Sequence, residues 1–211
     1  RFALFFLTKA RLASACAKAH LSAESCLQEN DGQYTSSSIM TRKQLEHILR
    51  ASGSISGCRE VIVIGSQAIL GSFPDAPKEL LQSLEADIYP KDTPDKADLI
   101  DGCIGELSPF HETFGYYAHG VSPETSDLPS NWKKRLVRVE SKNTGGTIGW
   151  CLSPAGLAVS KLLAGREKDI TYVKAMLKEK LVSKASIIAL LDQLNSSKCR
   201  LAKKRLDLCF Q

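Results

Sequence analysis

The chain has 211 residues, of which 43% are hydrophobic and 24% are charged. These values are ordinary for a globular chain with its own core, and they exclude global disorder, a collagen-like repeat and a multispan membrane protein. The net charge of +5 comes from residues 174–211, which carry nine basic and three acidic side chains. Such a stretch is typical of a solvated helix surface, or of a segment that contacts RNA or an acidic partner.

Neither a membrane span nor a zinc site is indicated. The longest uncharged apolar run, residues 2–7, is far shorter than the roughly 20 residues that cross a bilayer. The seven cysteines form no CxxC pair, which excludes the usual zinc spacing. Scattered thiols are typical of a reducing cytoplasm, where we expect this protein to reside.

The first residues differ in character from the rest. A polar stretch ends near residue 38, and Met40-Thr41 then begins a segment with helical spacing of apolar residues. We predict that residues 1–38 are an extension outside the core. Residues 39–152 are predicted to form an α/β core, and residues 153–211 a helical region.

In chain order, the core alternates helices and strands. We predict a helix over 41–51, a turn over 52–57, a strand over 61–64 and a helix start at 67–70. A loop over 73–77 follows, with a helix to about 83 and a strand over 85–89. A helix over 94–105 and strands over 116–121 and 132–140 complete the core. Ser153-Pro154 then starts a run of helices, continuing over about 168–180, 183–194 and 196–206. The order predicts a small mixed α/β sheet with a helical C-terminal cap.

Two short motifs carry the chemistry of the core. Gly65-Ser66 follows the buried 61–64 strand, and a glycine there lets the backbone approach a ligand such as a phosphate. Glu85 and Asp87 stand two apart on a predicted strand, so both project from one face. Adjacent acids repel unless a cation neutralises them, and Mg²⁺ with a triphosphate is the usual combination. The pattern predicts a magnesium and phosphate site.

Together these motifs resemble the signature of the polymerase-beta-like nucleotidyltransferase superfamily. Here Glu85 takes the place of the usual aspartate, and the gap between the motifs is longer than is usual in that superfamily. Residues 152–169 are similar to the helical Lys…Arg-x-x-Asp stretch of bacterial nucleotidyltransferase-like proteins related to AbiE-type abortive-infection toxins. The resemblance covers roughly residues 40–182.

The resemblance implies transfer of a nucleoside monophosphate from a nucleoside triphosphate to a hydroxyl of RNA or protein. It further implies a role in a toxin–antitoxin or phage-defence system, with a partner protein. Glu85 and Asp87 would hold the metal, with two ions if the enzyme is active, while Gly65 and Ser66 would seat the terminal phosphates.

The same resemblance assigns the later charged residues to the nucleotide. Lys161 would reach a phosphate as a point charge, and Asp169 would pair with Lys161 or Arg166, or orient them. We expect all of these residues on one helix or at its end. The ordinary alternatives are a salt-bridged helix surface here, an exposed edge strand at the acid pair, and a plain strand-to-helix turn at Gly65-Ser66.

The third acid of the superfamily, the general base, has no clear equivalent in this sequence. The predicted strand 116–121 offers His119 instead, Glu124 follows it as a similar candidate, and Glu140 ends another strand. Without a base, the chain would be an inactive nucleotidyltransferase fold that acts as an antitoxin or as a nucleic-acid or partner-binding module. A dinucleotide-binding oxidoreductase ranks lower, because Gln67 replaces the central glycine of GxGxxG.

Overall fold

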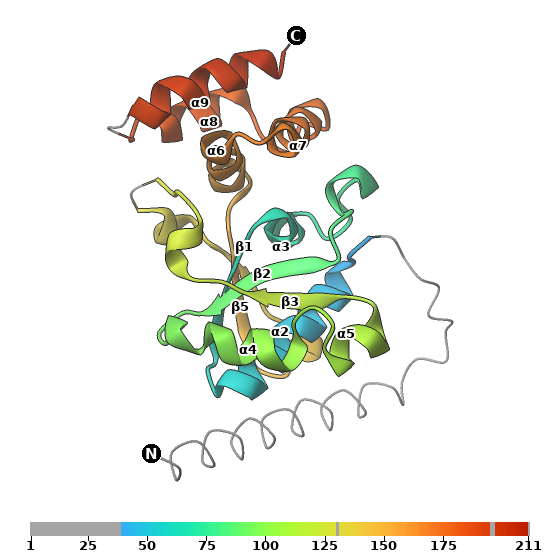
Figure 1. Ribbon diagram of the computed structural model, residues 1–211. Helices are drawn as coiled ribbons and strands as arrows, with labels where there is room; N and C mark the ends of the chain where they lie inside the picture. Colours follow the sequence, from blue (N-terminus) through green and yellow to red (C-terminus); the bar gives the residue numbers. More distant parts are fainter. Residues whose placement is uncertain (1–38, 130, 195–196, 211) are drawn as a thin grey trace.

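The structure, a computed structural model, describes residues 39–129, 131–194 and 197–210. Its centre is one five-stranded sheet in the order β3-β2-β1-β5-β4 (Figure 1). The strands are β1 (Glu60–Ile64), β2 (Glu85–Pro90), β3 (Tyr117–Gly120), β4 (Val137–Val139) and β5 (Ile148–Cys151).

Strand directions in the sheet are mixed. β1 is antiparallel to β2 and parallel to β5, while β2 is parallel to β3 and β4 is antiparallel to β5. The mixed α/β fold predicted from the sequence is therefore confirmed. The antiparallel β1–β2 pair also separates this sheet from the doubly wound parallel sheet of dinucleotide-binding oxidoreductases.

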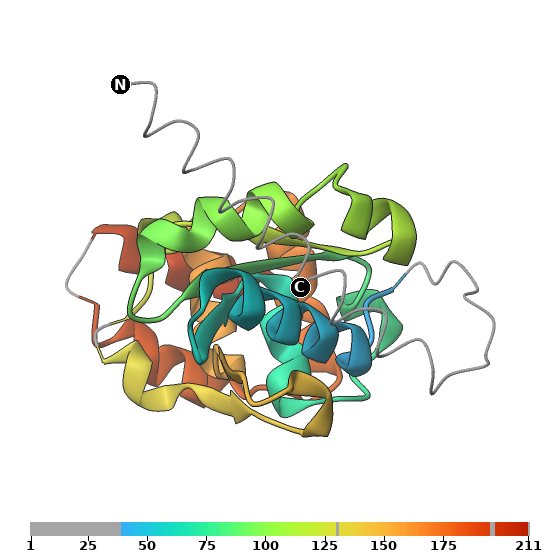
Figure 2. The ribbon, with the colours of Figure 1, turned by 90° about the horizontal axis from the view of Figure 1, so that it is seen from below.

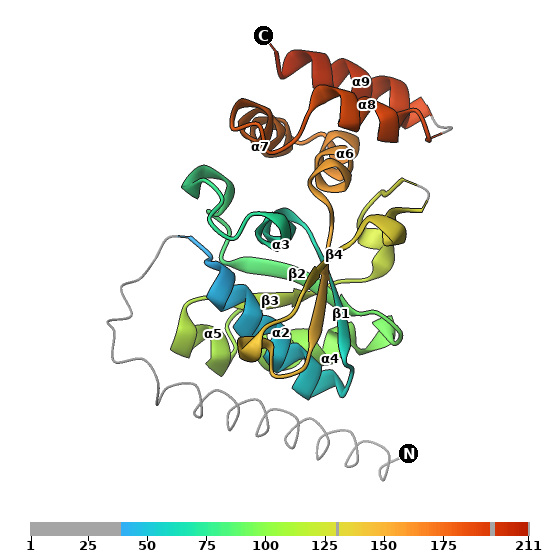
Figure 3. The same ribbon diagram turned by 180° about the vertical axis from the view of Figure 1, so that it is seen from behind.

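The helices form two groups, and one of them packs on the sheet. One face carries α2 (Arg42–Ser56), α4 (Ala97–Ile104) and α5 (Pro109–Phe114), with α2 crossing in front when the molecule is seen from below (Figure 2). The short α3 (Ile69–Ser72) follows β1, and the last helices form a separate layer (Figure 3). These are α6 (Pro154–Ala164), α7 (Glu167–Lys178), α8 (Lys184–Leu191) and α9 (Ser197–Leu208). Within the described ranges, no helix is long and apolar enough to cross a membrane.

The apolar run at residues 61–64 forms the central strand, as its composition predicts. All four of its side chains are at most 1% exposed, so β1 is buried on both faces. A strand held this firmly fixes the position of the residues that follow it, which here are Gly65 and Ser66.

Helix α2 begins where the sequence predicts and ends later. Thr41 is its N-cap and forms a capping box, but the helix runs on through the predicted turn at 52–57. Gly53 is needed inside the helix because a Cβ there would lie 2.2 Å from Thr147 Oγ1. The helix ends at Ser56, and its C-cap Gly57 has a left-handed φ of +68°.

Other boundaries also differ from the predictions. The predicted helix up to residue 83 is a single 3₁₀ turn, Lys78–Leu80, and the first part of the predicted 132–140 strand is another, Trp132–Arg135. Helix α5 was not predicted at all. The extension predicted at residues 1–38 lies outside the described residues.

Candidate active site

The turn after β1 brings backbone and carboxylate together. Gly65 has a φ of +69°, and a Cβ at this position would lie 1.9 Å from Asp87 Oδ2. Any other residue would therefore be strained and would displace the Asp87 carboxylate. The glycine at this corner serves the acid on the neighbouring strand as much as the turn itself.

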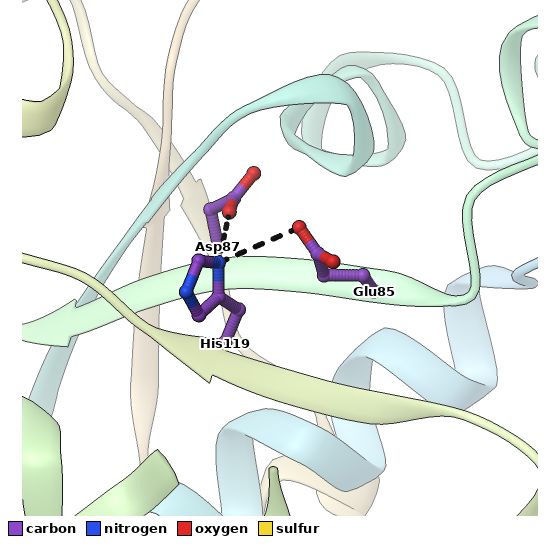
Figure 4. Close-up of side chains that lie close together, drawn as sticks. All are labelled: Glu85, Asp87 and His119. Carbon is purple, nitrogen blue, oxygen red and sulfur yellow. Dashed lines mark hydrogen bonds and ion pairs between the residues drawn. The ribbon is translucent and has the colours of Figure 1, made fainter. Parts of the chain in front are cut away.

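Glu85 and Asp87 project from the same face of β2, as their spacing predicts, and His119 joins them from β3. The strand register sets Asp87 opposite His119. His119 Nδ1 lies 3.1 Å from Asp87 Oδ1 and 3.5 Å from Glu85 Oε1 (Figure 4). One ligand atom from each of the three residues lies within 4.8 Å of the others.

The pKa values in this group reflect crowded negative charge. Burial and the charge of Glu85 raise the pKa of Asp87 to about 6, although a hydrogen bond with His119 works in the other direction. Burial lowers the pKa of His119, but the hydrogen bond to Asp87 and the nearby carboxylates outweigh it and raise that pKa. Two carboxylates thus share one imidazole.

Tyr117 orients Glu85, the more exposed acid of the pair. Its hydroxyl donates a hydrogen bond to Glu85 Oε2 at 3.0 Å. Burial and this bond raise the pKa of Tyr117, so the phenol keeps its proton and remains a donor. No role was predicted for this residue from the sequence, although its position two residues before His119 on one strand places both on the same face.

A second charged group lies on the helical layer and faces the Gly65-Ser66 turn, called the corner below. Lys161 Nζ, on α6, donates to Ser66 Oγ at 3.0 Å and to Asp169 Oδ1 at 3.3 Å. Arg166 Nε donates to Asp169 Oδ2 at 2.7 Å. These residues do not all lie on one helix or at its end: Lys161 lies on α6, whose C-cap Gly165 has a φ of +68°, whereas Arg166 is the N-cap of α7 and Asp169 lies in the first turn of α7.

Burial and pairing compete in this basic group. Burial would raise the pKa of Asp169, but hydrogen bonds from Arg166 and Lys161 overcome it and lower that pKa. Burial lowers the pKa of Lys161 more than Asp169 raises it. The hydrogen bond to Asp169 raises the pKa of Arg166. The group is held as a network around one fully buried carboxylate.

Tyr172 ties this network to the sheet. Its hydroxyl donates to the Ser66 carbonyl at 2.7 Å, and Lys161 Nζ lies 4.2 Å from the centre of its ring. Gln67 Nε2 donates to the Ser83 carbonyl at 2.7 Å, which joins the corner to the segment before β2. Neither Tyr172 nor Gln67 was assigned a role in the site from the sequence.

Both charged groups line one cleft between the sheet and the helical layer. Its volume is about 1130 Å³. The predicted site residues that line it are Gly65, Ser66, Glu85, Asp87, His119, Lys161, Arg166 and Asp169. Among the described residues, Glu124 and Glu140 do not line this cleft. The charge of Glu124 acts on Tyr89 instead: burial and this charge raise the pKa of Tyr89 to about 12. Glu140 pairs with Arg138.

A family model described as "Nucleotidyltransferase of unknown function (DUF6036)" matches residues 42–204. This is well over half of the chain. The chain belongs to this nucleotidyltransferase family. No curated protein and no solved structure matched it. The part of the chain shared with the DUF6036 nucleotidyltransferases spans all five strands and helices α6 and α7, and so includes both sides of the cleft.

Proposed function

We propose that this member of the DUF6036 family is a metal-dependent nucleotidyltransferase. It transfers a nucleoside monophosphate from a nucleoside triphosphate to a hydroxyl acceptor. The supporting observation is the cleft, which brings the acid pair Glu85 and Asp87 together with the Ser66 hydroxyl and with Lys161 from the helical layer. A metal-bound triphosphate has the matching arrangement of charge, since it carries a cation and an excess of negative oxygens.

The residues of the acid side fit a divalent cation. Glu85, Asp87 and His119 offer carboxylate oxygens and an imidazole nitrogen within one ion's reach. Gly65 keeps the space beside Asp87 free of a side chain. Once bound, such a cation, with Mg²⁺ as our prediction from the sequence, would neutralise charge on the phosphates and polarise the bond to be broken.

The basic side would bind the rest of the triphosphate. Lys161 presents its ammonium group beside the Ser66 hydroxyl, so both can bind the terminal phosphates. Arg166 is 63% exposed at its side chain and extends from the rim, where it can contact phosphate while still paired with Asp169. The predicted role of His119 as general base stays a prediction, because its Nδ1 faces the two carboxylates.

The resemblance to proteins related to AbiE-type toxins supports a finer proposal for the acceptor. We propose a hydroxyl on RNA or protein as acceptor, and a partner protein in a bacterial toxin–antitoxin or phage-defence pair. This step rests on the similarity of residues 152–169 alone.

The test is label transfer by the purified chain. Each ribonucleoside triphosphate is supplied with a labelled α-phosphate, together with Mg²⁺ or Mn²⁺ and a total extract of RNA and protein as acceptor. We expect wild type to label a macromolecule, and the double variant Glu85→Gln/Asp87→Asn to lose at least about a hundredfold in rate, because the metal ligands are gone. Asp95→Asn/Asp98→Asn removes the same charge from exposed residues outside the cleft and should transfer normally. Equal transfer by wild type and the site variant would refute the assignment.

One observation favours a second candidate function. The residue opposite Asp87 on β3 is an imidazole, where the resemblance leads us to expect a third acid. An inactive fold that binds nucleotide or a partner protein, such as an antitoxin, would tolerate this change. Wild type that transfers no label under any of these conditions, yet retains a triphosphate in equilibrium dialysis, would support this alternative.

A further inference from the structure

We infer that the acid side of the cleft takes a divalent first-row transition ion in preference to Mg²⁺, and that His119 is the third protein ligand. The inference deepens the proposed function, since it rests on the metal site proposed there. It concerns which ion this donor set selects, and it departs from the Mg²⁺ that we predict from the sequence.

The donor set carries the inference. Mg²⁺ takes oxygen ligands, demands nearly octahedral geometry and keeps several waters. An imidazole nitrogen is instead a common ligand of divalent transition ions, which also accept carboxylates. His119 directs Nδ1 toward both acids, at 3.1 Å from Asp87 Oδ1 and 3.5 Å from Glu85 Oε1 (Figure 4). The nitrogen therefore lies among the carboxylate oxygens.

The strand position of His119 is fixed from both sides. The parallel pairing of β2 and β3 fixes His119 beside Asp87, and the next residue, Gly120, donates its backbone N–H to Asp101 Oδ1 at 3.1 Å. A Cβ at Gly120 would lie 2.1 Å from the Ala97 carbonyl oxygen, so helix α4 packs directly behind the strand. Ligands on rigid, adjacent strands keep their geometry when an ion binds.

The same geometry has a competing interpretation with the opposite consequence. A protonated His119 would itself be the cation between Glu85 and Asp87, and a metal ion would then have to displace it. If His119 is a ligand, removing the ring weakens metal binding. If His119 is an internal cation, removing the ring strengthens metal binding.

A Mn²⁺ titration of the whole chain, without triphosphate and followed by electron paramagnetic resonance, distinguishes His119 as a metal ligand from His119 as an internal cation. Mg²⁺ is added in competition to give the preference. We expect His119→Ala to weaken Mn²⁺ binding by at least about tenfold, since even changes in the outer shell cost that much. His119→Asp, which makes the set all-oxygen, should shift the preference toward Mg²⁺. Asp95→Asn/Asp98→Asn should bind like wild type, and Glu85→Gln/Asp87→Asn should not bind.

Three results would overturn the inference: wild type that binds no Mn²⁺, wild type that binds Mg²⁺ as tightly as Mn²⁺ or more tightly, or His119→Ala that binds Mn²⁺ as tightly as wild type or more tightly. The proposed function is judged separately. Wild type that transfers label while His119→Ala keeps its Mn²⁺ affinity would refute this inference and leave the function standing. Wild type that binds Mn²⁺ through His119 but never transfers label would do the reverse.

Discussion

The two sides of the cleft manage their charges in opposite ways. On the helical side, one buried carboxylate, Asp169, pairs with both Lys161 and Arg166. On the sheet side, two carboxylates, Glu85 and Asp87, share one imidazole. The helical side holds one carboxylate between two cations, whereas the sheet side, among the described residues, has two carboxylates for one imidazole and so carries the excess of negative charge.

The two aspartates show what this difference means. The pKa of Asp169 is lowered, because its hydrogen bonds to cations outweigh burial, whereas burial and a like charge raise the pKa of Asp87 to about 6. Asp169 therefore contributes to folding as an ion. The ionised carboxylate of Asp87 destabilises the folded protein, and this penalty is removed only when a cation or a proton binds to it. This contrast distinguishes a structural carboxylate from a ligand-binding one.

Removing Asp169 should have the largest effect on stability. In Asp169→Ala, Lys161 is left 8% exposed and without its carboxylate, and breaking a buried pair on one side costs about 3–5 kcal/mol. We expect that loss in the free energy of unfolding, measured in urea at pH 7.5. Arg166→Ala is the matched control: its guanidinium is largely exposed and Lys161 still pairs with Asp169, so the loss should stay below about 1 kcal/mol. Similar losses in the two variants would show that burial does not decide the strength of this network.

Removing the charge of Asp87 should have the opposite sign. Its pKa is about 6 in the folded protein, against an ordinary value of 3.8 for an aspartate, and the side chain is 25% exposed. Above pH 6 the carboxylate is ionised in both the folded and the unfolded chain and destabilises the fold. We expect Asp87→Asn, in a chelator at pH 8, to be more stable than wild type by about 1–3 kcal/mol.

This gain should depend on pH. As the pH falls through 6 toward 4, wild-type Asp87 becomes protonated in the folded state and the penalty disappears, so the two unfolding curves should converge. Urea unfolding at several pH values measures the difference directly. A variant that is less stable than wild type at pH 8 would mean that His119 already compensates the charge in full.

The sequence predicted the fold where local signals agree with packing. The β-branched run at 61–64 is enough to identify a buried strand, and Thr41 is enough to start α2. The end of α2 could not be predicted, because the Gly/Ser stretch is typical of a turn until Gly53 is seen against Thr147. Helix α5 could have been found: Ser108-Pro109 is the same cap-plus-proline start as Ser153-Pro154.

The site was predictable only where spacing within one element decides it. A spacing of two residues on one strand is sufficient to predict that Glu85 and Asp87 project from the same face. The meeting of His119 with them depends on the β2–β3 register, which the sequence does not state. The expectation of Lys161 and Asp169 on one helix or at its end missed the break between α6 and α7, because Gly165 was not recognised as a helix end. Tyr172 was missed because its partner, the Ser66 carbonyl, comes from a distant part of the chain.

Tyr172 allows the smallest and most specific test of how the two sides are joined. Tyr172→Phe keeps the ring beneath Lys161 but removes the hydroxyl that donates to the Ser66 carbonyl. We expect a loss of about 0.5–1.5 kcal/mol in stability, as for one hydrogen bond. If the hydroxyl also positions Ser66 for phosphate, the KM for triphosphate should rise more than kcat falls. Tyr172→Leu removes both the ring and the hydroxyl, so it should lose more stability and raise the KM further than Tyr172→Phe. A phenylalanine variant with wild-type KM would show that the hydrogen bond from Tyr172 to the Ser66 carbonyl is not needed to position Ser66 for the triphosphate.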